Sequence, residues 1–179
     1  MSSSKKILRR KYKHILQNIN PSNSLHISNK LLPHIPSENS LILSFAKLDS
    51  QNEIDLSILN IHLAKNQRLA LPRVNTSSHL LDLFIVSDID SIILSDYGIP
   101  EPDPNICTPV KPEDIDIVLV PGLAFDHQMN RLGRGKGFYD KLLTQIKGTK
   151  IGVCFQEQIS NDILPTDPWD QKVDILIFN

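Results

Sequence analysis

The sequence IDIVLVPGLAFD, residues 115–126, is followed after three residues by NRLGRGKGFYDKLL, residues 130–143, and this stretch decides the fold. Asp116 to Val120 predicts a strand buried on both faces, because its apolar run is typical of the middle of a covered sheet. Lys136 to Ile146 predicts a helix. A strand, a glycine-rich loop and a helix in this order place the loop at the carboxyl edge of an α/β sheet, where such proteins bind ligands.

Helices and strands are predicted to alternate along the rest of the chain. The predicted helices are 7–19, ahead of Pro21; 22–32, with Ser22 as N-cap and Pro33 as stop; and 54–63, with Glu53 and Asp55 at its positive N-terminal end. The other predicted strands are 41–46, 67–71 (stopped by Pro72), 80–86, 150–155 and 173–178. A short turn or helix is expected after residue 86, up to Leu94.

The segment from Tyr97 to Lys111 holds four of the twelve prolines, so we expect a surface loop there, long enough to indicate a functional role. The β–α–β succession before it predicts parallel strands with a right-handed crossover. We therefore expect one α/β domain over residues 1–179, a three-layer α/β/α sandwich with a mostly parallel sheet.

Composition limits the classes of function. With 179 residues and a formal net charge of −1, the chain offers no bulk attraction to nucleic acid or to an anionic membrane. Cys107 and Cys154 lie far apart and form no CxxC motif, which favours reduced thiols. No apolar run has the length of a membrane span, and none follows the charged N-terminus as in a signal peptide. A cytoplasmic location is expected, without membrane or nucleic-acid partners.

Three of only seven glycines, Gly133, Gly135 and Gly137, alternate with basic residues in the run RLGRGKG. Glycine allows positive φ, and successive backbone N–H groups that lead into a helix form an anion-binding concavity. Arg131, Arg134 and Lys136 add positive charge, so the loop predicts a polyphosphate ligand. The alternative is a glycine-rich surface turn with solvated cations.

The loop is neither a Walker A motif nor a dinucleotide fingerprint. Gly137 follows Lys136 where a Walker A motif has Ser or Thr, so the hydroxyl that would hold magnesium is missing. A metal would need carboxylates from elsewhere, and Asp140 and Asp170 are the candidates. The six histidines show no metal-ligand spacing.

At these residues the chain resembles the 5-formyltetrahydrofolate cyclo-ligases, also called methenyltetrahydrofolate synthetases. VLVPGLAFD (118–126) and NRLGRGKGFYDKLL (130–143) carry the resemblance, because the family has a VPGLAFD segment and then a RLGxGxGYYD loop. KKILR, NEI, LALP, GIPEP, IGVCFQEQ and WDQKVD support it in order along the chain. The resemblance implies an α/β sandwich of the sugar-phosphate isomerase and CoA-transferase type.

The resemblance also implies ATP- and magnesium-dependent cyclisation of 5-formyltetrahydrofolate to 5,10-methenyltetrahydrofolate, by a cytoplasmic enzyme expected to be a monomer. It assigns ATP contacts to Lys5, Arg9 and the loop Arg131, Leu132, Gly133, Arg134, Gly135, Lys136, Gly137, Phe138 and Tyr139. It assigns folate contacts to Glu53 and to Arg134, Gly135, Lys136, Gly137 and Phe138, and magnesium to Asp140 and Asp170. Arg134 and Lys136 are the expected catalytic residues.

Two residues depart from the family. Met129 stands where glycine is usual, so if the turn needs positive φ, either Met129 is strained there or the turn is different. Phe138 replaces a common tyrosine and removes one hydroxyl. Neither change removes a charged catalytic group, and altered affinity is expected.

Other interpretations of the same residues stay open. Lys5 and Arg9 have the i, i+4 spacing of a solvated helix face. Glu53 and Asp140 could complement helix N-termini, Tyr139 could pack in the core, and Trp169 could cover either the site or the sheet edge. For the protein, the alternatives are a module that binds a phosphorylated metabolite without turnover, and a sugar-phosphate isomerase or transferase.

Overall fold

The computed structural model describes residues 3–20, 24–36, 39–48, 52–95 and 98–179. Its helices are α1 (Ser3–Gln17), α2 (Ser24–Leu31), α3 (Ser57–Lys65) and α4 (Phe138–Leu143), with 3₁₀ turns η2 (Leu32–His34), η4 (Ile89–Ser91), η5 (Pro112–Asp114) and η6 (Gln156–Gln158). Its strands are β1 (Ile42–Leu43), β2 (Leu69–Asn75), β3 (Leu80–Val86), β4 (Ile92–Leu94), β5 (Pro100–Pro102), β6 (Thr108–Val110), β7 (Ile117–Val120), β8 (Ala124–Asp126), β9 (Arg131–Leu132), β10 (Thr149–Cys154), β11 (Ile159–Ser160) and β12 (Ile175–Phe178).

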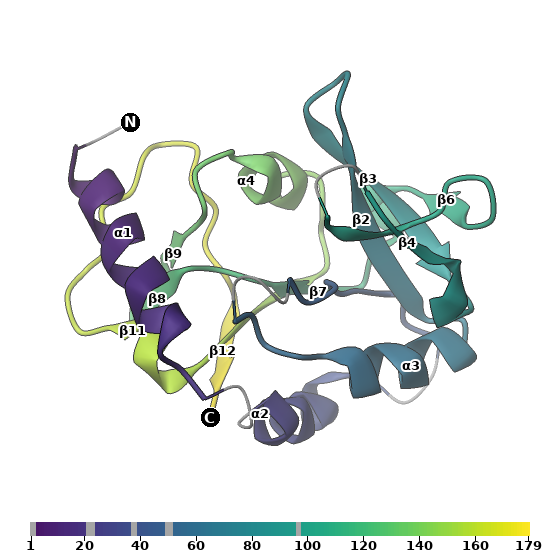
Figure 1. Cartoon of the computed structure of the whole chain (residues 1–179), viewed down its shortest axis with the longest axis horizontal. Coiled ribbons are helices and arrows are strands. Elements are labelled where there is room, and N and C mark those ends of the chain that lie inside the picture. The colour runs from purple at the N-terminus through teal and green to yellow at the C-terminus, as the bar shows by residue number, and fades with distance from the viewer. Residues whose placement is uncertain (1–2, 21–23, 37–38, 49–51, 96–97) are drawn as a thin grey trace.

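The main sheet has the strand order β12-β10-β7-β1-β2-β3-β6. Its first five strands pair in parallel, and β3 and β6 add antiparallel neighbours. The hairpin of β2 and β3 projects beyond the rest of the molecule (Figure 1). The prediction of an α/β fold with a mostly parallel sheet is confirmed.

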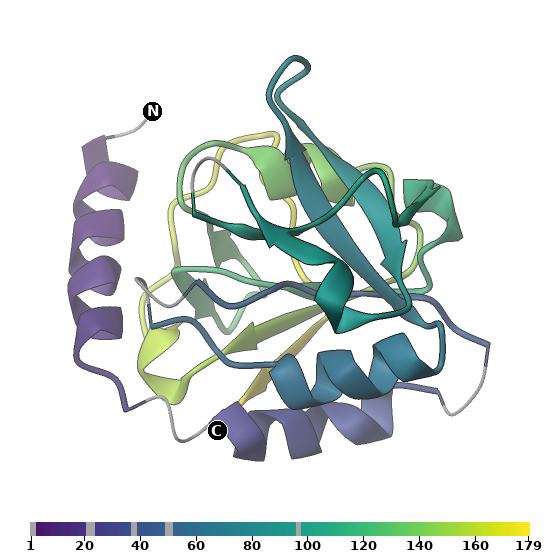
Figure 2. The ribbon, with the colours of Figure 1, turned by 45° about the vertical axis from the view of Figure 1, so that its right-hand side comes forward.

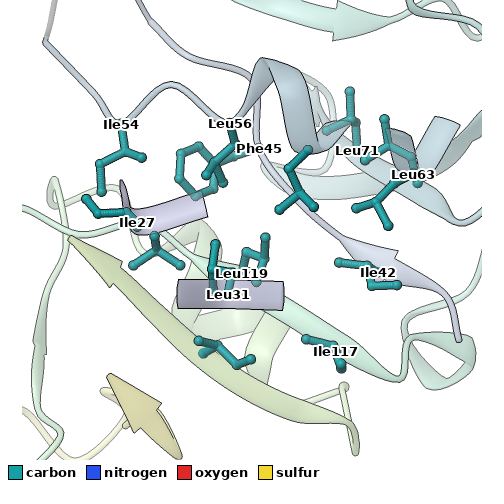
Figure 3. Close-up of a cluster of buried hydrophobic side chains, with 14 of the residues drawn as sticks. Ile27, Leu31, Ile42, Phe45, Ile54, Leu56, Leu63, Leu71, Ile117 and Leu119 are labelled. Carbon is teal, nitrogen blue, oxygen red and sulfur yellow. The ribbon is translucent and has the colours of Figure 1, made fainter. Parts of the chain in front are cut away.

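Hydrophobic cores lie on both faces of this sheet, because the strand residues alternate between them. Ile42, Ile117 and Leu119 join the cluster that contains α2 and α3 residues such as Leu31 and Leu63 (Figure 3). Their neighbours Leu43, Val118 and Val120 join a second cluster with Leu142 and Leu143 of α4. Accordingly, α2 and α3 lie on one side of the sheet and α4 on the other (Figures 1 and 2).

Helix α1 stands at the flank of the molecule, beside the small sheet β11-β8-β9 and next to η6 (Figure 2). Tyr12 and Leu16 are buried in the first cluster, whereas Ile7, the first residue of the predicted helix 7–19, is exposed. Lys5 is buried instead. No helix within the described ranges is long and apolar enough to cross a membrane.

Several predicted helix boundaries shift. The helix expected from Ile54 begins at Ser57, because the Asp55 Oδ1 accepts the Ser57 backbone N–H (2.9 Å) in a turn ahead of α3. Glu53 therefore lies in a loop and not at a helix N-terminus. The helix expected over 136–146 covers only Phe138–Leu143, and the left-handed Gly137 (φ 71°) accounts for its later start. The stop Pro21 and the cap Ser22 fall outside the described residues.

The prediction that Pro72 ends its strand is wrong, since β2 continues past it to Asn75. The carbonyls of Arg68 and Ala70 accept N–H groups from Ile42 and Ser44, so even-numbered residues of this strand face β1. Pro72 comes next on that side, beyond the last residue of β1, and its missing N–H ends only the β1 pairing while β2 continues against β3. The expected strand 41–46 is correspondingly reduced to Ile42–Leu43.

The segment predicted as a surface loop from Tyr97 to Lys111 contains two short strands. β5 pairs with β4, and β6 adds an edge to the main sheet. Glu101 and Cys107 are buried there, and the Glu101 carboxylate accepts the Val74 backbone N–H at 3.1 Å. Tyr97 itself lies outside the described residues.

Candidate active site

A cavity of about 860 Å³ opens at the carboxyl ends of the central parallel strands. Phe45 and Ala46 follow β1, Pro121 and Gly122 follow β7, and Leu71 belongs to β2. The glycine loop from Gly133 to Gly137 forms another part of the wall, together with Glu53, Arg131, Phe138, Tyr139 and Asp140. The glycine loop therefore borders a cavity at the carboxyl edge of the sheet, where the sequence predicted it to lie.

The glycine loop connects β9 to α4 in a conformation that needs glycine. Gly135 (φ 105°) and Gly137 (φ 71°) have positive φ, and Gly137 is the residue that precedes α4. A Cβ on Gly133 would lie only 3.0 Å from Nη1 of Arg131, so the absent side chain lets the guanidinium pack under the loop. Arg134 and Lys136 are exposed on the same loop, with Lys136 Nζ 6.0 Å from the centre of the Phe138 ring.

Arg131 is buried beneath the loop and fixes the start of α4. Its Nη2 donates to Asp140 Oδ1 at 2.7 Å and its Nη1 to the Pro121 carbonyl at 3.3 Å. The guanidinium lies 5.7 Å from the centre of the Tyr139 ring. Burial raises the pKa of Tyr139, and the negative charge of Glu53 adds to the rise. The phenol is therefore neutral and available as a donor at the cavity wall.

Glu53 connects the loop after β1 to the glycine loop. Its Oε2 accepts the Leu48 backbone N–H at 3.1 Å, and its Oε1 forms an ion pair with Arg134. Two residues predicted to contact the folate, 81 positions apart in sequence, are thus in direct contact.

The N-terminal helix presents Lys5, Arg9 and Lys13 at four-residue spacing, which places them on one face. Lys5 Nζ donates to Asp167 Oδ2 at 2.7 Å and also to Asp170. Arg9 Nε donates to the Gly133 carbonyl at 2.9 Å, and Lys13 lines the cavity. Helix α1 therefore connects the glycine loop to the C-terminal segment, and the alternative of a solvated face is excluded for Lys5 and Arg9.

The charges around Lys5 reinforce one another. Burial by itself lowers the pKa of Lys5, but the hydrogen bonds to Asp167 and Asp170 and their charges outweigh it and raise that pKa. The hydrogen bond from Lys5 in turn holds the pKa of Asp167 below its usual value. Lys5 and Asp167 are therefore both ionised at neutral pH.

The two predicted magnesium ligands, Asp140 and Asp170, belong to neighbouring segments. The backbone N–H of Gln171, the residue after Asp170, points at Asp140 Oδ1 (3.4 Å). Each carboxylate is mostly shielded and already faces one cation, Arg131 or Lys5. In the described part of the chain no group of three or more His, Cys, Asp or Glu side chains could hold a metal. Two carboxylates nevertheless fit magnesium, which takes oxygen ligands and is usually shared between one or two carboxylates and substrate phosphates.

Sequence reasoning missed Asp126, which organises the turn before the glycine loop. Its carboxylate is buried and accepts the backbone N–H groups of Gln128 (2.9 Å), Asn130 (3.0 Å) and Leu164 (2.8 Å), and the Asn130 side chain (2.8 Å). Burial would raise the pKa of Asp126, but these hydrogen bonds hold it below its usual value. The spacing of Asp126 and Asn130 around a turn was the available signal.

Sequence reasoning also gave no role to Asp167 or Lys13. The sequence DPWD, residues 167–170, signals a turn, but only the fold brings it to Lys5. Trp169, which could have covered the site, is 66% exposed.

The sequence of the whole chain, residues 1–179, matches the family model described as the 5-formyltetrahydrofolate cyclo-ligase family. The chain belongs to this family. Among cyclo-ligase family members, the mouse (Mus musculus) 5-formyltetrahydrofolate cyclo-ligase is 30% identical over 87% of this chain and 81% of its own length. A probable 5-formyltetrahydrofolate cyclo-ligase from Schizosaccharomyces pombe is 29% identical, and the match spans 67% of this chain and 65% of that protein.

Solved structures of the cyclo-ligase family agree with the fold. The structure of Aquifex aeolicus 5,10-methenyltetrahydrofolate synthetase superposes with a TM-score of 0.79 at 33% identity, over 97% of this chain and 89% of that one. The 5,10-methenyltetrahydrofolate synthetase from Mycoplasma pneumoniae gives a TM-score of 0.73 at 24% identity over 97% of both chains, a likeness of fold. The resemblance inferred from the sequence is confirmed.

Proposed function

We propose that the chain catalyses the ATP-dependent cyclisation of 5-formyltetrahydrofolate to 5,10-methenyltetrahydrofolate, releasing ADP and phosphate. Membership of the cyclo-ligase family supports this reaction. The structural observation that carries it is one cavity lined both by the cationic glycine loop and by apolar side chains such as Phe45 and Leu71. A polyphosphate suits the first surface, and a flat heterocycle suits the second.

The reaction needs ATP because the formyl group on N5 is amide-like and its carbon is a poor electrophile. Transfer of the γ-phosphoryl group to the formyl oxygen creates a leaving group and releases ADP. N10 then attacks the formyl carbon and loses its proton, and phosphate departs with the oxygen. Such transfers depend mainly on positioning and on neutralising charge at the phosphoryl oxygens.

In this scheme each cation has a place. Lys136 and Arg134 neutralise the transferred phosphoryl group, while the backbone N–H groups from Leu132 to Tyr139 hold the triphosphate together with Lys5 and Arg9. Because Arg134 also pairs with Glu53, it connects the phosphate to the folate side of the cavity. Asp140 and Asp170 would hold magnesium, which supplies charge neutralisation when bound.

The remaining parts of the proposal concern the oligomeric state, the cellular location and the type of fold. We infer a monomer that acts in the cytoplasm, and a fold of the sugar-phosphate isomerase and CoA-transferase type. The mostly parallel sheet with helices on both faces supports the last of these.

The test is a spectrophotometric assay of the methenyl chromophore with 5-formyltetrahydrofolate, ATP and magnesium. We expect Lys136→Ala to lower kcat by a factor of about 100 or more, as for other preorganised transition-state donors. The exposed Lys141 of α4 provides the control, since Lys141→Ala removes an equal charge nearby. Binding of ATP and folate without chromophore in the wild type would instead identify a binding module. Unchanged turnover in Lys136→Ala would refute the phosphate assignment.

A further inference from the structure

Lys5 contacts two carboxylates of the C-terminal segment, and the proposed function assigns a role to only one of them. Lys5 is 3% exposed, and its ammonium group faces both Asp167 and Asp170. Of these two carboxylates, only Asp170 is assigned to magnesium. Asp167 has no assigned role, although its hydrogen bond to Lys5 measures 2.7 Å.

A single turn positions both carboxylates. The Asp167 backbone N–H donates to Asp170 Oδ2 at 2.7 Å, and the Asp170 backbone N–H donates to the Asp167 carbonyl at 3.0 Å. The same turn therefore places both carboxylates beside Lys5. An ammonium group has three N–H donors, so the two carboxylates leave the third donor for a further anion.

The contacts of Lys5 change if a divalent cation binds the Asp170 carboxylate. A metal ion competes with the ammonium group for the same oxygens, and like charges repel. Lys5 then keeps one negative partner, Asp167, which holds a long and otherwise flexible side chain in place. We propose that Asp167 is a positioning residue that holds Lys5 toward the nucleotide phosphates, an inference that rests on the proposed function.

The test measures binding of a non-hydrolysable ATP analogue, with and without magnesium, to the whole chain. Trp169 is the chain's one tryptophan and lies between Asp167 and Asp170 in the turn, so its fluorescence reports on this segment, and calorimetry gives an independent dissociation constant. We expect Asp167→Ala to weaken analogue binding in magnesium about tenfold, as for one charge-assisted hydrogen bond. Asp167→Asn, which keeps an acceptor, should lie between, and the KM for folate should stay unchanged.

A double-mutant cycle separates positioning from other roles. In a Lys5→Met background, Asp167→Ala should change the affinity less than about twofold, because the residue acts only through Lys5. An equal loss with and without Lys5 would overturn the inference and indicate a metal ligand or a structural role. Asp162→Ala, an exposed carboxylate of the same segment, is the control and should bind as the wild type does.

The outcomes also separate the inference from the proposed function. Equal analogue binding by the wild type and Asp167→Ala would overturn the inference alone. Absence of binding by the wild type would overturn the proposed function, and the inference with it. If circular dichroism finds Asp167→Ala unfolded, the Asn variant carries the same comparison.

Discussion

Met129 has the backbone conformation that its family position requires. Its φ is 64°, in the left-handed region, while its carbonyl accepts the Val173 N–H at 3.1 Å and its side chain packs on the core next to α4. Of the two expectations for this turn, the structure therefore shows the first, a positive φ at a residue that is not glycine. The side chain therefore contributes packing at a place where the backbone is strained.

Comparing alanine with glycine at residue 129 isolates this strain. We expect Met129→Gly to be more stable than Met129→Ala by about 1 kcal/mol, since alanine keeps the left-handed penalty and glycine does not. The same pair at Lys11, an exposed residue within α1, should show the opposite order by a similar amount. Urea denaturation measures both differences. If alanine were more stable than glycine at residue 129 as well as at residue 11, the turn would be unstrained.

At the scale of elements, the turn between β8 and β9 depends on the charge of Asp126. The folded-state pKa of Asp126 lies below the ordinary value of 3.8. Its contribution to stability is therefore fully present above that value, and is lost as the pH falls through the lower, folded-state pKa. The hydrogen bonds that lower the pKa of Asp126 come from the turn between β8 and β9 and from the Leu164 backbone N–H.

Replacing Asp126 by Asn should lower the free energy of unfolding at pH 7 by about 2 kcal/mol, because an amide nitrogen would face N–H donors. The difference from the wild type should shrink as the pH falls below 3.8 toward the folded-state pKa of Asp126, because the wild type then loses its charge and the variant has none to lose. Asp162→Asn, in an exposed carboxylate, serves as control. Urea denaturation curves between pH 3 and 7 that stay parallel would contradict this assignment.

The elements that sequence predicted well are those fixed by local pattern. Strand β3 begins and ends at the predicted residues, Leu80 and Val86, and the apolar run of β7 lies in the middle of the sheet. The errors arise from tertiary context. Pro72 is tolerated because its missing N–H faces the side of β1 and leaves the pairing with β3 intact, and the proline-rich segment forms β5 against β4 and β6 against β3.

The same distinction holds for the candidate site. The glycine loop could be predicted from the residues, because scarce glycines and cations gather in seven positions. Lys5, Arg9 and Asp170 came from the family resemblance, since no local pattern joins the two ends of the chain. Asp167 and Asp126 act through hydrogen bonds that only the folded chain brings together.

At the scale of the whole molecule, the two thiols report on opening of the core. Cys154 is fully buried in β10, and burial raises its pKa, while Cys107 is 7% exposed near the edge strand β6. Thiol reagents react with the accessible thiolate, so native protein should react slowly.

We expect Cys107 to react first with a chromogenic disulfide, because edge segments open more readily than central strands, and Cys154 to react only with global unfolding. The variants Cys107→Ser and Cys154→Ser assign the two phases. Rapid modification of both thiols in native conditions would contradict the burial of Cys154.

Lys5 and Asp170, which are 165 positions apart, meet in one ion pair. During synthesis, the first helix therefore cannot meet its charged partners until the segment around Asp170 has also been made and has left the ribosome. Until then that helix lacks its ion pairs with the C-terminal segment, so the first residues of the chain to be made are among the last to reach their folded contacts.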